Sequence, residues 1–144
     1  MSVPLYVDGC DVSLDPATTD NVRANLAALA GCTHLLRPGD VSVLGQGPVL
    51  DGRGCLALRL PSGLWAASGP AEALEALLAD LGRALAGGAT PGTALARVLP
   101  GRGAVVEGAP ADWWLVPGGP LANIEALRRP RHVVVAGRRL GGTG

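Results

Sequence analysis

Glycine and proline break this chain into short pieces, and they constrain its fold more than any other feature of the sequence. The 144 residues include 22 glycines and 12 prolines, most of which lie between stretches of apolar residues. We therefore expect short strands and helices joined by tight turns. With 48% hydrophobic residues, the chain has enough apolar side chains for one packed core. Residues 1–144 are predicted to form a single domain without repeats.

The first half is expected to contain one helix among several strands. Val3–Val7 is rich in β-forming residues and precedes the turn pair Asp8-Gly9, so it is predicted to be a strand. Asp15 then has the character of a helix N-cap, and apolar residues recur after it at helical spacing. This pattern predicts a helix over Pro16–Ala30. Further short strands are expected at Val41–Leu44, Cys55–Leu60 and Leu64–Ala67.

Two pairs of glycines in this half, Gly45 with Gly47 and Gly52 with Gly54, have the composition of phosphate-binding loops. Neither pair lies between a strand and a helix N-terminus with the spacing that such loops need. Hairpin turns are their predicted role.

The second half has the clearest helical signal. Leucines recur along one face of the stretch Glu72–Leu85, which is predicted to be a helix. Thr90-Pro91 resembles a helix cap and opens a shorter helix through Val98. Strands are expected at Ala104–Val106, Trp113–Val116 and His132–Ala136. The predicted fold class is thus α+β, a sheet or sandwich of mostly short strands with two to three flanking helices.

Adjacent tryptophans, Trp113 and Trp114, lie in one of these predicted strands. Neighbouring strand residues point to opposite faces of a sheet. One tryptophan should therefore pack inward, while the other reaches a second layer or a partner. A buried interface is the preferred interpretation, and an aromatic binding floor is the alternative.

The C-terminal segment resembles the end of metal-dependent amidohydrolases. That family shows Gly-x-x-Ala-Asp, an apolar strand, a turn with Pro-Leu, a short helix, a second apolar strand and Gly-Arg. The matching residues here are Gly108, Ala111, Asp112, Trp113–Val116, Pro120, Leu121, Val133–Val135, Gly137 and Arg138. The similarity extends upstream over about residues 60–140 and is greatest to N-acetylglucosamine-6-phosphate deacetylases. The resemblance implies a small β-rich composite domain, the domain that supports the catalytic barrel in those enzymes.

The residues that hold the metal in that family are missing from this sequence. The family carries a His-x-His pair and further histidines, whereas this chain has two isolated histidines, His34 and His132. A complete (β/α)8 barrel also takes about 250 residues. We therefore expect a stand-alone composite domain that acts in binding or assembly and has no autonomous metal site.

Two alternatives remain open. The first is a reduced hydrolase of C–N bonds, of the deacetylase or cyclic amidase type, with Asp8, Asp11 and His34 as its catalytic residues. Zinc would be its cofactor, because zinc sites draw on carboxylate and imidazole ligands; otherwise no cofactor is indicated. The second alternative is a small-ligand or regulatory binding module.

The charge and the cysteine content indicate which partners and which cellular compartment to expect. The formal net charge is zero, although arginines concentrate near the C-terminus, so neither nucleic acid nor a membrane is an expected partner. A homo-oligomer or a partner chain is expected instead, in the cytoplasm. Three widely spaced cysteines, Cys10, Cys32 and Cys55, are predicted to be buried reduced thiols.

Overall fold

The computed structural model describes residues 4–16, 20–36, 48–61 and 70–141. Its elements in chain order are β1 (Leu5–Asp15), β2 (Asp20–Leu29), β3 (Cys32–Leu36), β4 (Val49–Asp51), β5 (Cys55–Arg59), α2 (Pro70–Ala86), α3 (Pro91–Val98), the 3-10 helix η2 (Pro100–Gly103), β6 (Trp113–Pro117), the 3-10 helix η3 (Ile124–Arg128), β7 (His132–Val135) and β8 (Arg138–Gly141). The predicted α+β class agrees with this arrangement. The predicted strands Val41–Leu44 and Leu64–Ala67, and the turn Gly45–Gly47, lie outside the described residues.

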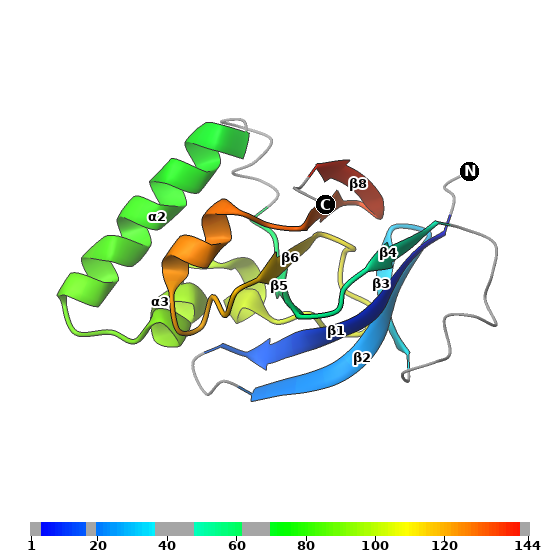
Figure 1. Ribbon diagram of the computed structural model, residues 1–144, viewed down its shortest axis with the longest axis horizontal. Coiled ribbons are helices and arrows are strands. Elements are labelled where there is room, and N and C mark those ends of the chain that lie inside the picture. Colours follow the sequence, from blue (N-terminus) through cyan, green and yellow to red (C-terminus); the bar gives the residue numbers. More distant parts are fainter. Residues whose placement is uncertain (1–3, 17–19, 37–47, 62–69, 142–144) are drawn as a thin grey trace.

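The described strands form one mixed sheet in the order β3-β2-β1-β5-β6-β7-β8, and β4 also pairs with β1. Neighbouring strands are antiparallel except where β1 meets β4 and β5, which both run parallel to it. Figure 1 shows α2 and α3 at one end of the molecule and β3 and β4 toward the other. Both helices therefore lie over the half of the sheet that contains β5 and β6.

One side of the sheet, which we call the inner face, encloses an apolar cluster. Its members come from β1, β2, β5, β6 and β7, and include Val7, Leu26, Trp113, Leu115 and Val134. The chain between η2 and β6 closes this cluster from the side, because the backbone of Ala109 and Gly108 bonds to Thr33 on β3. Trp113 is fully buried here and donates its indole N–H to Thr33 Oγ1 over 2.9 Å.

The opposite side of β5, β6 and β7, which we call the outer face, is covered by helices. Its cluster combines Leu58, Trp114, Val116 and Val133 from the strands with leucines of α2 and α3. Trp114 is fully buried within this single chain. The second layer expected for one tryptophan is therefore the helical layer, which leaves Trp114 no exposed surface for a binding floor.

The helices agree with the sequence prediction. α2 extends over Pro70–Ala86, slightly beyond the predicted range. α3 begins after Thr90, whose hydroxyl accepts a hydrogen bond from the Thr93 backbone N–H at 3.2 Å. This is the N-cap that the sequence predicts at Thr90.

The predicted helix Pro16–Ala30 is wrong, because Asp20–Leu29 forms strand β2. The apolar spacing of four residues between Val22 and Leu26 fits a strand as well as a helix, since four is also an even number. Ala24–Ala28 is buried on both faces of the sheet and has no polar alternation that would reveal a strand. Tertiary pairing with β1 and β3 decides the conformation.

The first strand also differs from its prediction, because it does not end at Asp8-Gly9. These two residues lie opposite the single residue Asn25 of β2 and form a β-bulge, with Gly9 at a φ of 79°. The buried amide Oδ1 of Asn25 accepts the Gly9 N–H at 2.8 Å. The strand therefore continues to Asp15, and Cys10 and Val12 after the bulge still face the core.

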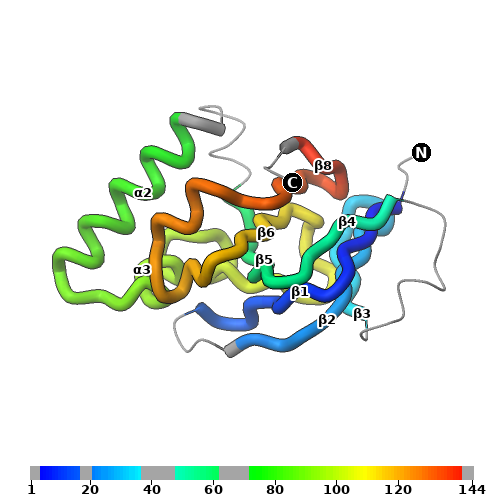
Figure 2. Tube along the Cα trace, in the orientation of Figure 1, coloured from blue at the N-terminus to red at the C-terminus, as the bar shows by residue number. Residues whose placement is uncertain are grey.

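Gly52–Gly54 forms a turn but not the expected hairpin. It joins β4 and β5, which follow one another in the same direction along β1, as the tube view shows (Figure 2). Gly52 donates its N–H to the carbonyl of Asp8 at 2.8 Å. A Cβ at Gly52 would lie 2.6 Å from Val7 Cγ1, so this close approach needs glycine.

Two further predictions need correction. Ala104–Val106 is not a strand; its backbone crosses the end of β1, where the Val105 N–H bonds to the Ser13 carbonyl.

All three cysteines are free thiols, and Cys10 and Cys55 are buried as expected, but Cys32 is exposed. Cys32 begins β3 at a tight turn, where its side chain faces solvent. The remaining predicted strands Cys55–Leu60, Trp113–Val116 and His132–Ala136 correspond to β5, β6 and β7.

Candidate functional site

A groove of about 640 Å³ lies between β4 and the strands β7 and β8. Its lining residues are Val49, Leu50 and Asp51 on one side and Arg131, His132 and Arg139 on the other. We call it the β4–β7 groove. Parallel pairing to β1 fixes the position of β4, and antiparallel pairing to β6 fixes β7. The two walls are thus held by the same sheet.

His132 lies at the base of the groove and is 4% exposed. It pairs with Leu115 across β6 and β7, so its ring extends on the inner face. Nε2 lies 3.1 Å from the Asp51 carbonyl oxygen, and the Arg139 Nε–H donates to Nδ1 over 2.9 Å. Because a carbonyl only accepts, these contacts fix the neutral tautomer with its proton on Nε2. Burial, together with the nearby Arg139 and Arg131, lowers the pKa of His132 below its ordinary value of 6.5.

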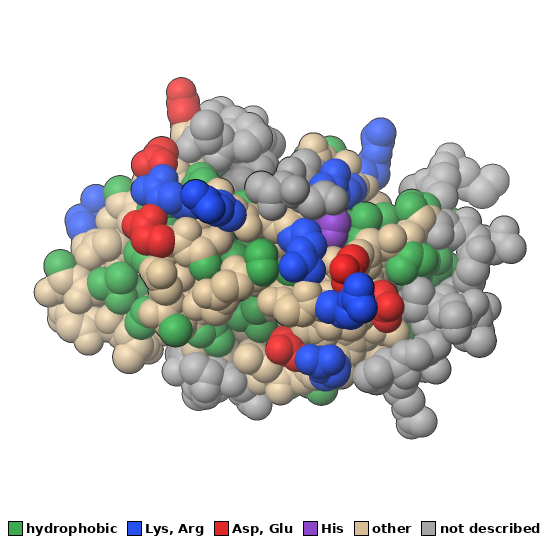
Figure 3. Space-filling view, viewed as in Figure 1, with side chains coloured by type: hydrophobic (Ala, Val, Ile, Leu, Met, Phe, Trp, Pro, Cys, Tyr) green, Lys and Arg blue, Asp and Glu red, His purple; other side chains and the backbone are tan. Residues whose placement is uncertain are grey.

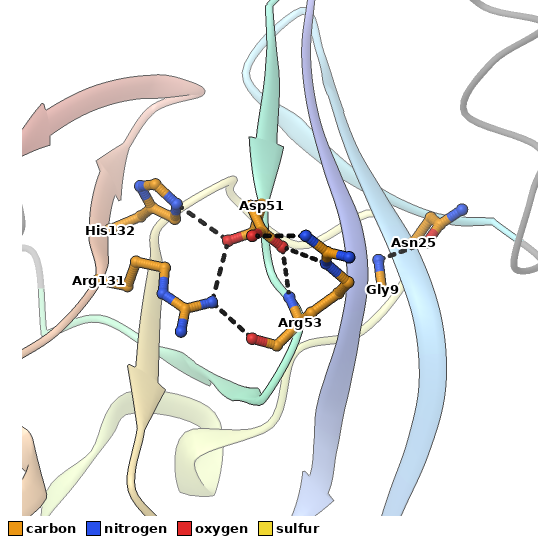
Figure 4. Close-up of polar contacts among 6 residues, drawn as sticks. All are labelled: Gly9, Asn25, Asp51, Arg53, Arg131 and His132. Carbon is orange, nitrogen blue, oxygen red and sulfur yellow. Dashed lines mark hydrogen bonds and ion pairs between the residues drawn. The ribbon is translucent and has the colours of Figure 1, made fainter. Parts of the chain in front are cut away.

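Arg131 binds the opposite wall through backbone oxygens. Its Nη1 donates to the carbonyl of Arg53 at 2.5 Å and lies 3.5 Å from that of Asp51. Figure 4 shows Arg131 and His132 reaching Asp51 from the same side. In the described part of the chain, the Nε and Nη2 edge of this guanidinium has no hydrogen-bond acceptor.

The carboxylate of Asp51 is already engaged. Arg53 donates to it through Nε at 3.0 Å, Nη2 at 3.2 Å and its backbone N–H at 3.0 Å. These hydrogen bonds and the charge of Arg53 lower the pKa of Asp51 to about 2. Asp51 is therefore a poor general base near neutral pH, because its proton affinity is too low.

The groove carries an excess of positive charge. Within the described residues, neither Arg131 nor Arg139 lies within ion-pair distance of a carboxylate. Arginine side chains gather around a histidine on this face of the molecule (Figure 3). With His132 neutral, the lining groups carry two guanidinium charges against one carboxylate. The arrangement therefore suits an anion.

The structure does not gather the three residues predicted as catalytic. Asp8 lies exposed in the β1 bulge. Asp11 pairs with Arg23 at 3.7 Å, and His34 on β3 pairs with Glu107 at 2.7 Å. Among the described residues, no three His, Cys, Asp or Glu side chains form a group that could hold a metal ion. Asp11 and His34 thus contact different partners at the surface.

The buried thiols do not supply a nucleophile either. Burial raises the pKa of Cys10 to about 12 and also raises that of Cys55. Both thiols stay protonated near neutral pH, and the thiolate is the reactive form. Cys55 and Asp11 line a second, smaller groove of about 240 Å³.

The sequence predicted none of the groove residues as functional, although it showed where positive charge is concentrated. The concentration of arginines near the C-terminus without acidic partners was the signal for Arg131 and Arg139, and it correctly indicated local positive charge. His132 was predicted as the start of a strand, which it is. No sequence signal indicated Val49 or Asp51, because β4 reaches the groove through its pairing with β1.

Comparisons with known proteins found no matching family model, no similar curated protein and no similar solved structure. None of the described helices is long and apolar enough to cross a bilayer.

Proposed function

We propose that this protein is a small-ligand binding domain, related to the composite domain of amidohydrolases, which binds a small anion in the β4–β7 groove. The observation that carries the proposal is the pair Arg131 and Arg139, two guanidinium groups that line one groove without a carboxylate partner among the described residues. Guanidinium groups bind carboxylate and phosphate through paired N–H donors. The groove volume is also in the range of small-molecule sites.

The amidohydrolase-like origin rests on the C-terminal segment. The resemblance expects an apolar strand, a Pro-Leu turn, a short helix, a second strand and Gly-Arg. The chain has, in the same order, β6, Pro120-Leu121, η3, β7 and Gly137-Arg138. This agreement in the order of elements supports a relation to the supporting domain, which in those enzymes does not carry the metal.

A binding role is favoured over the hydrolase alternative. Hydrolysis of a C–N bond needs an activated water or nucleophile beside a group that stabilises the developing charge. Asp11 and His34 are each paired elsewhere, and the Asp51 carboxylate is held by Arg53. The hydrogen bonds of His132 are likewise directed to Asp51 and Arg139. Within the described residues, the groove thus offers donors for an anion and no poised base.

Isothermal titration at pH 7.5 with acetate and inorganic phosphate tests the proposal, with arginine variants as controls. Arg139→Met should weaken anion binding at least tenfold, whereas Arg138→Met, the same charge change on the neighbouring residue of β8, should leave it within twofold. Equal losses in both variants, or no binding of either anion to the wild type, would refute the proposal. Metal analysis and a deacetylase and amidase screen belong to the same test, and robust turnover would favour the hydrolase alternative.

The expected homo-oligomer stays a prediction. No partner is needed to cover the second tryptophan, because Trp114 is buried within one chain. Light scattering on the purified protein at several concentrations would measure the oligomeric state directly.

A further inference from the structure

The two walls of the β4–β7 groove differ in chemistry. The β4 wall presents Val49, which is 54% exposed, and the half-buried Leu50. The opposite wall presents the guanidinium groups of Arg131 and Arg139. An exposed valine beside two arginines that have no carboxylate partner among the described residues suits a ligand that has one apolar side and one charged end.

The donors on the charged wall match a flat two-oxygen anion. The Nη1 atom of Arg131 is used by backbone carbonyls, which leaves its Nε and Nη2 edge without an acceptor in the described part of the chain. This edge presents two parallel N–H groups, the geometry that binds both oxygens of a carboxylate. Arg139 uses Nε for His132 and Nη2 for the Arg131 carbonyl, so Nη1 is its remaining donor.

The donors that remain in the lining favour a carboxylate. Arg131 and Arg139 contribute two positive charges, whereas the Asp51 carboxylate is already paired with Arg53. His132 is neutral, because Nδ1 accepts from Arg139 and burial lowers its pKa. A carboxylate can use both of its oxygens on these guanidinium donors without placing a further charged oxygen beside the Asp51 carboxylate.

We propose that the ligand of the β4–β7 groove is a small carboxylic acid with an apolar body, whose carboxylate binds Arg131 and Arg139 and whose apolar part covers Val49 and Leu50. His132 is a positioning residue in this site, because its Nδ1 accepts a hydrogen bond from Arg139 Nε and so orients the Arg139 side chain. The inference rests on the proposed anion-binding function and adds the class of the anion.

A chain-length series tests this class in the full-length protein. Acetate, butanoate, hexanoate and octanoate are titrated at pH 7.5, with hexanamide as the uncharged control and hexyl phosphate as the dianionic one. Affinity should rise about two- to fourfold per methylene until the apolar wall is covered. Hexanamide should bind at least tenfold more weakly than hexanoate, and hexyl phosphate should bind less tightly than hexanoate.

Variants of each wall separate the two contributions. Val49→Ser should reduce the gain in affinity per methylene, measured as the ratio of the hexanoate to the acetate affinity in the variant and in the wild type. Arg139→Lys keeps the charge but loses the planar fork, so it should weaken hexanoate about tenfold. His132→Asn keeps an acceptor for Arg139 and should preserve binding better than His132→Ala.

The outcomes distinguish this inference from the proposed function. If acetate and hexanoate bind equally well through Arg139, the anion site stands and the apolar ligand class is refuted. Tighter binding of hexyl phosphate than of hexanoate would refute the choice of a carboxylate. If no anion in the series binds, the proposed function itself fails, and the inference fails with it.

Discussion

The inner and outer faces of the sheet bury adjacent tryptophans by different means. Trp113, on the inner face, is enclosed by strands and by the chain between η2 and β6, and its indole N–H bonds to Thr33 far away in the sequence. Trp114, on the outer face, is covered by leucines of α2 and α3. The outer face therefore depends on helices whose pattern is local, whereas the inner face depends on contacts between distant segments.

Truncation of one large buried side chain on each face should give the largest loss of stability and should test whether the two faces unfold differently. Trp113→Ala should lower the free energy of unfolding by about 3–5 kcal/mol, and Leu81→Ala on α2 by about 2–5 kcal/mol, because each leaves a cavity. Denaturant unfolding measures both losses, with the exposed Arg97→Ala as the control. Hydrogen exchange should rise most in α2 for Leu81→Ala and throughout the sheet for Trp113→Ala. Identical exchange profiles in the two variants would mean that the faces are not energetically distinct.

Two glycine-to-alanine substitutions should change the free energy of unfolding in opposite directions. Gly52→Ala would place its Cβ 2.6 Å from Val7 Cγ1 and 3.0 Å from Cys10 Cβ on the inner face, and such overpacking should cost about 1–3 kcal/mol. Gly82 occupies an exposed position of α2, where an added Cβ meets nothing within 4 Å. Gly82→Ala should stabilise the protein by about 0.5–1 kcal/mol, because alanine favours a helix over glycine. Thermal unfolding of both variants measures the difference, and a stabilised Gly52→Ala would show that the inner face can expand.

The smallest effect should be a pH dependence of the free energy of unfolding, which comes from His132 at the rim of the inner face. The pKa of His132 is lower in the folded protein than its ordinary value of 6.5, so the unfolded chain takes up a proton first as the pH falls. The stabilisation is therefore present above pH 6.5 and is lost as the pH falls toward the folded pKa. Denaturant unfolding between pH 7.5 and 5.5 should show this loss in the wild type and in His34→Gln, but not in His132→Gln. A loss that persists in His132→Gln would assign it to another group.

The helices over the outer face could be predicted from the sequence, whereas the strands of the inner face could be predicted only in part. The helices α2 and α3 could be predicted because leucine spacing and the Thr90 cap are encoded within each segment. β2 could not, because Ala24–Ala28 is buried on both sides and its spacing fits two periodicities. The Asp8-Gly9 pair has the composition of a turn, and the bulge depends on Asn25 in the next strand.

The candidate site shows the same limit. Arg131 and Arg139 belong to a charged segment that is visible in the sequence, but Val49 and Asp51 join them through the parallel pairing of β4 with β1. The residues that were predicted, Asp8, Asp11 and His34, share the chemistry of a hydrolytic site without the geometry. Residue type indicated what chemistry was possible, and only the pairing of distant strands decided which side chains meet.

The parallel pairing of β1 with β5 also has a consequence for how the sheet assembles. It joins two antiparallel groups, β1–β3 and β5–β8, through the register pairs Asp11 with Leu56 and Val12 with Ala57. The β1–β2 hairpin closes a short loop, whereas this seam closes a loop of some forty residues, and such long-range pairing forms more slowly. The seam is therefore expected to form after the β1–β2 hairpin. An opening along it would expose the two buried thiols, Cys10 and Cys55, in the same event.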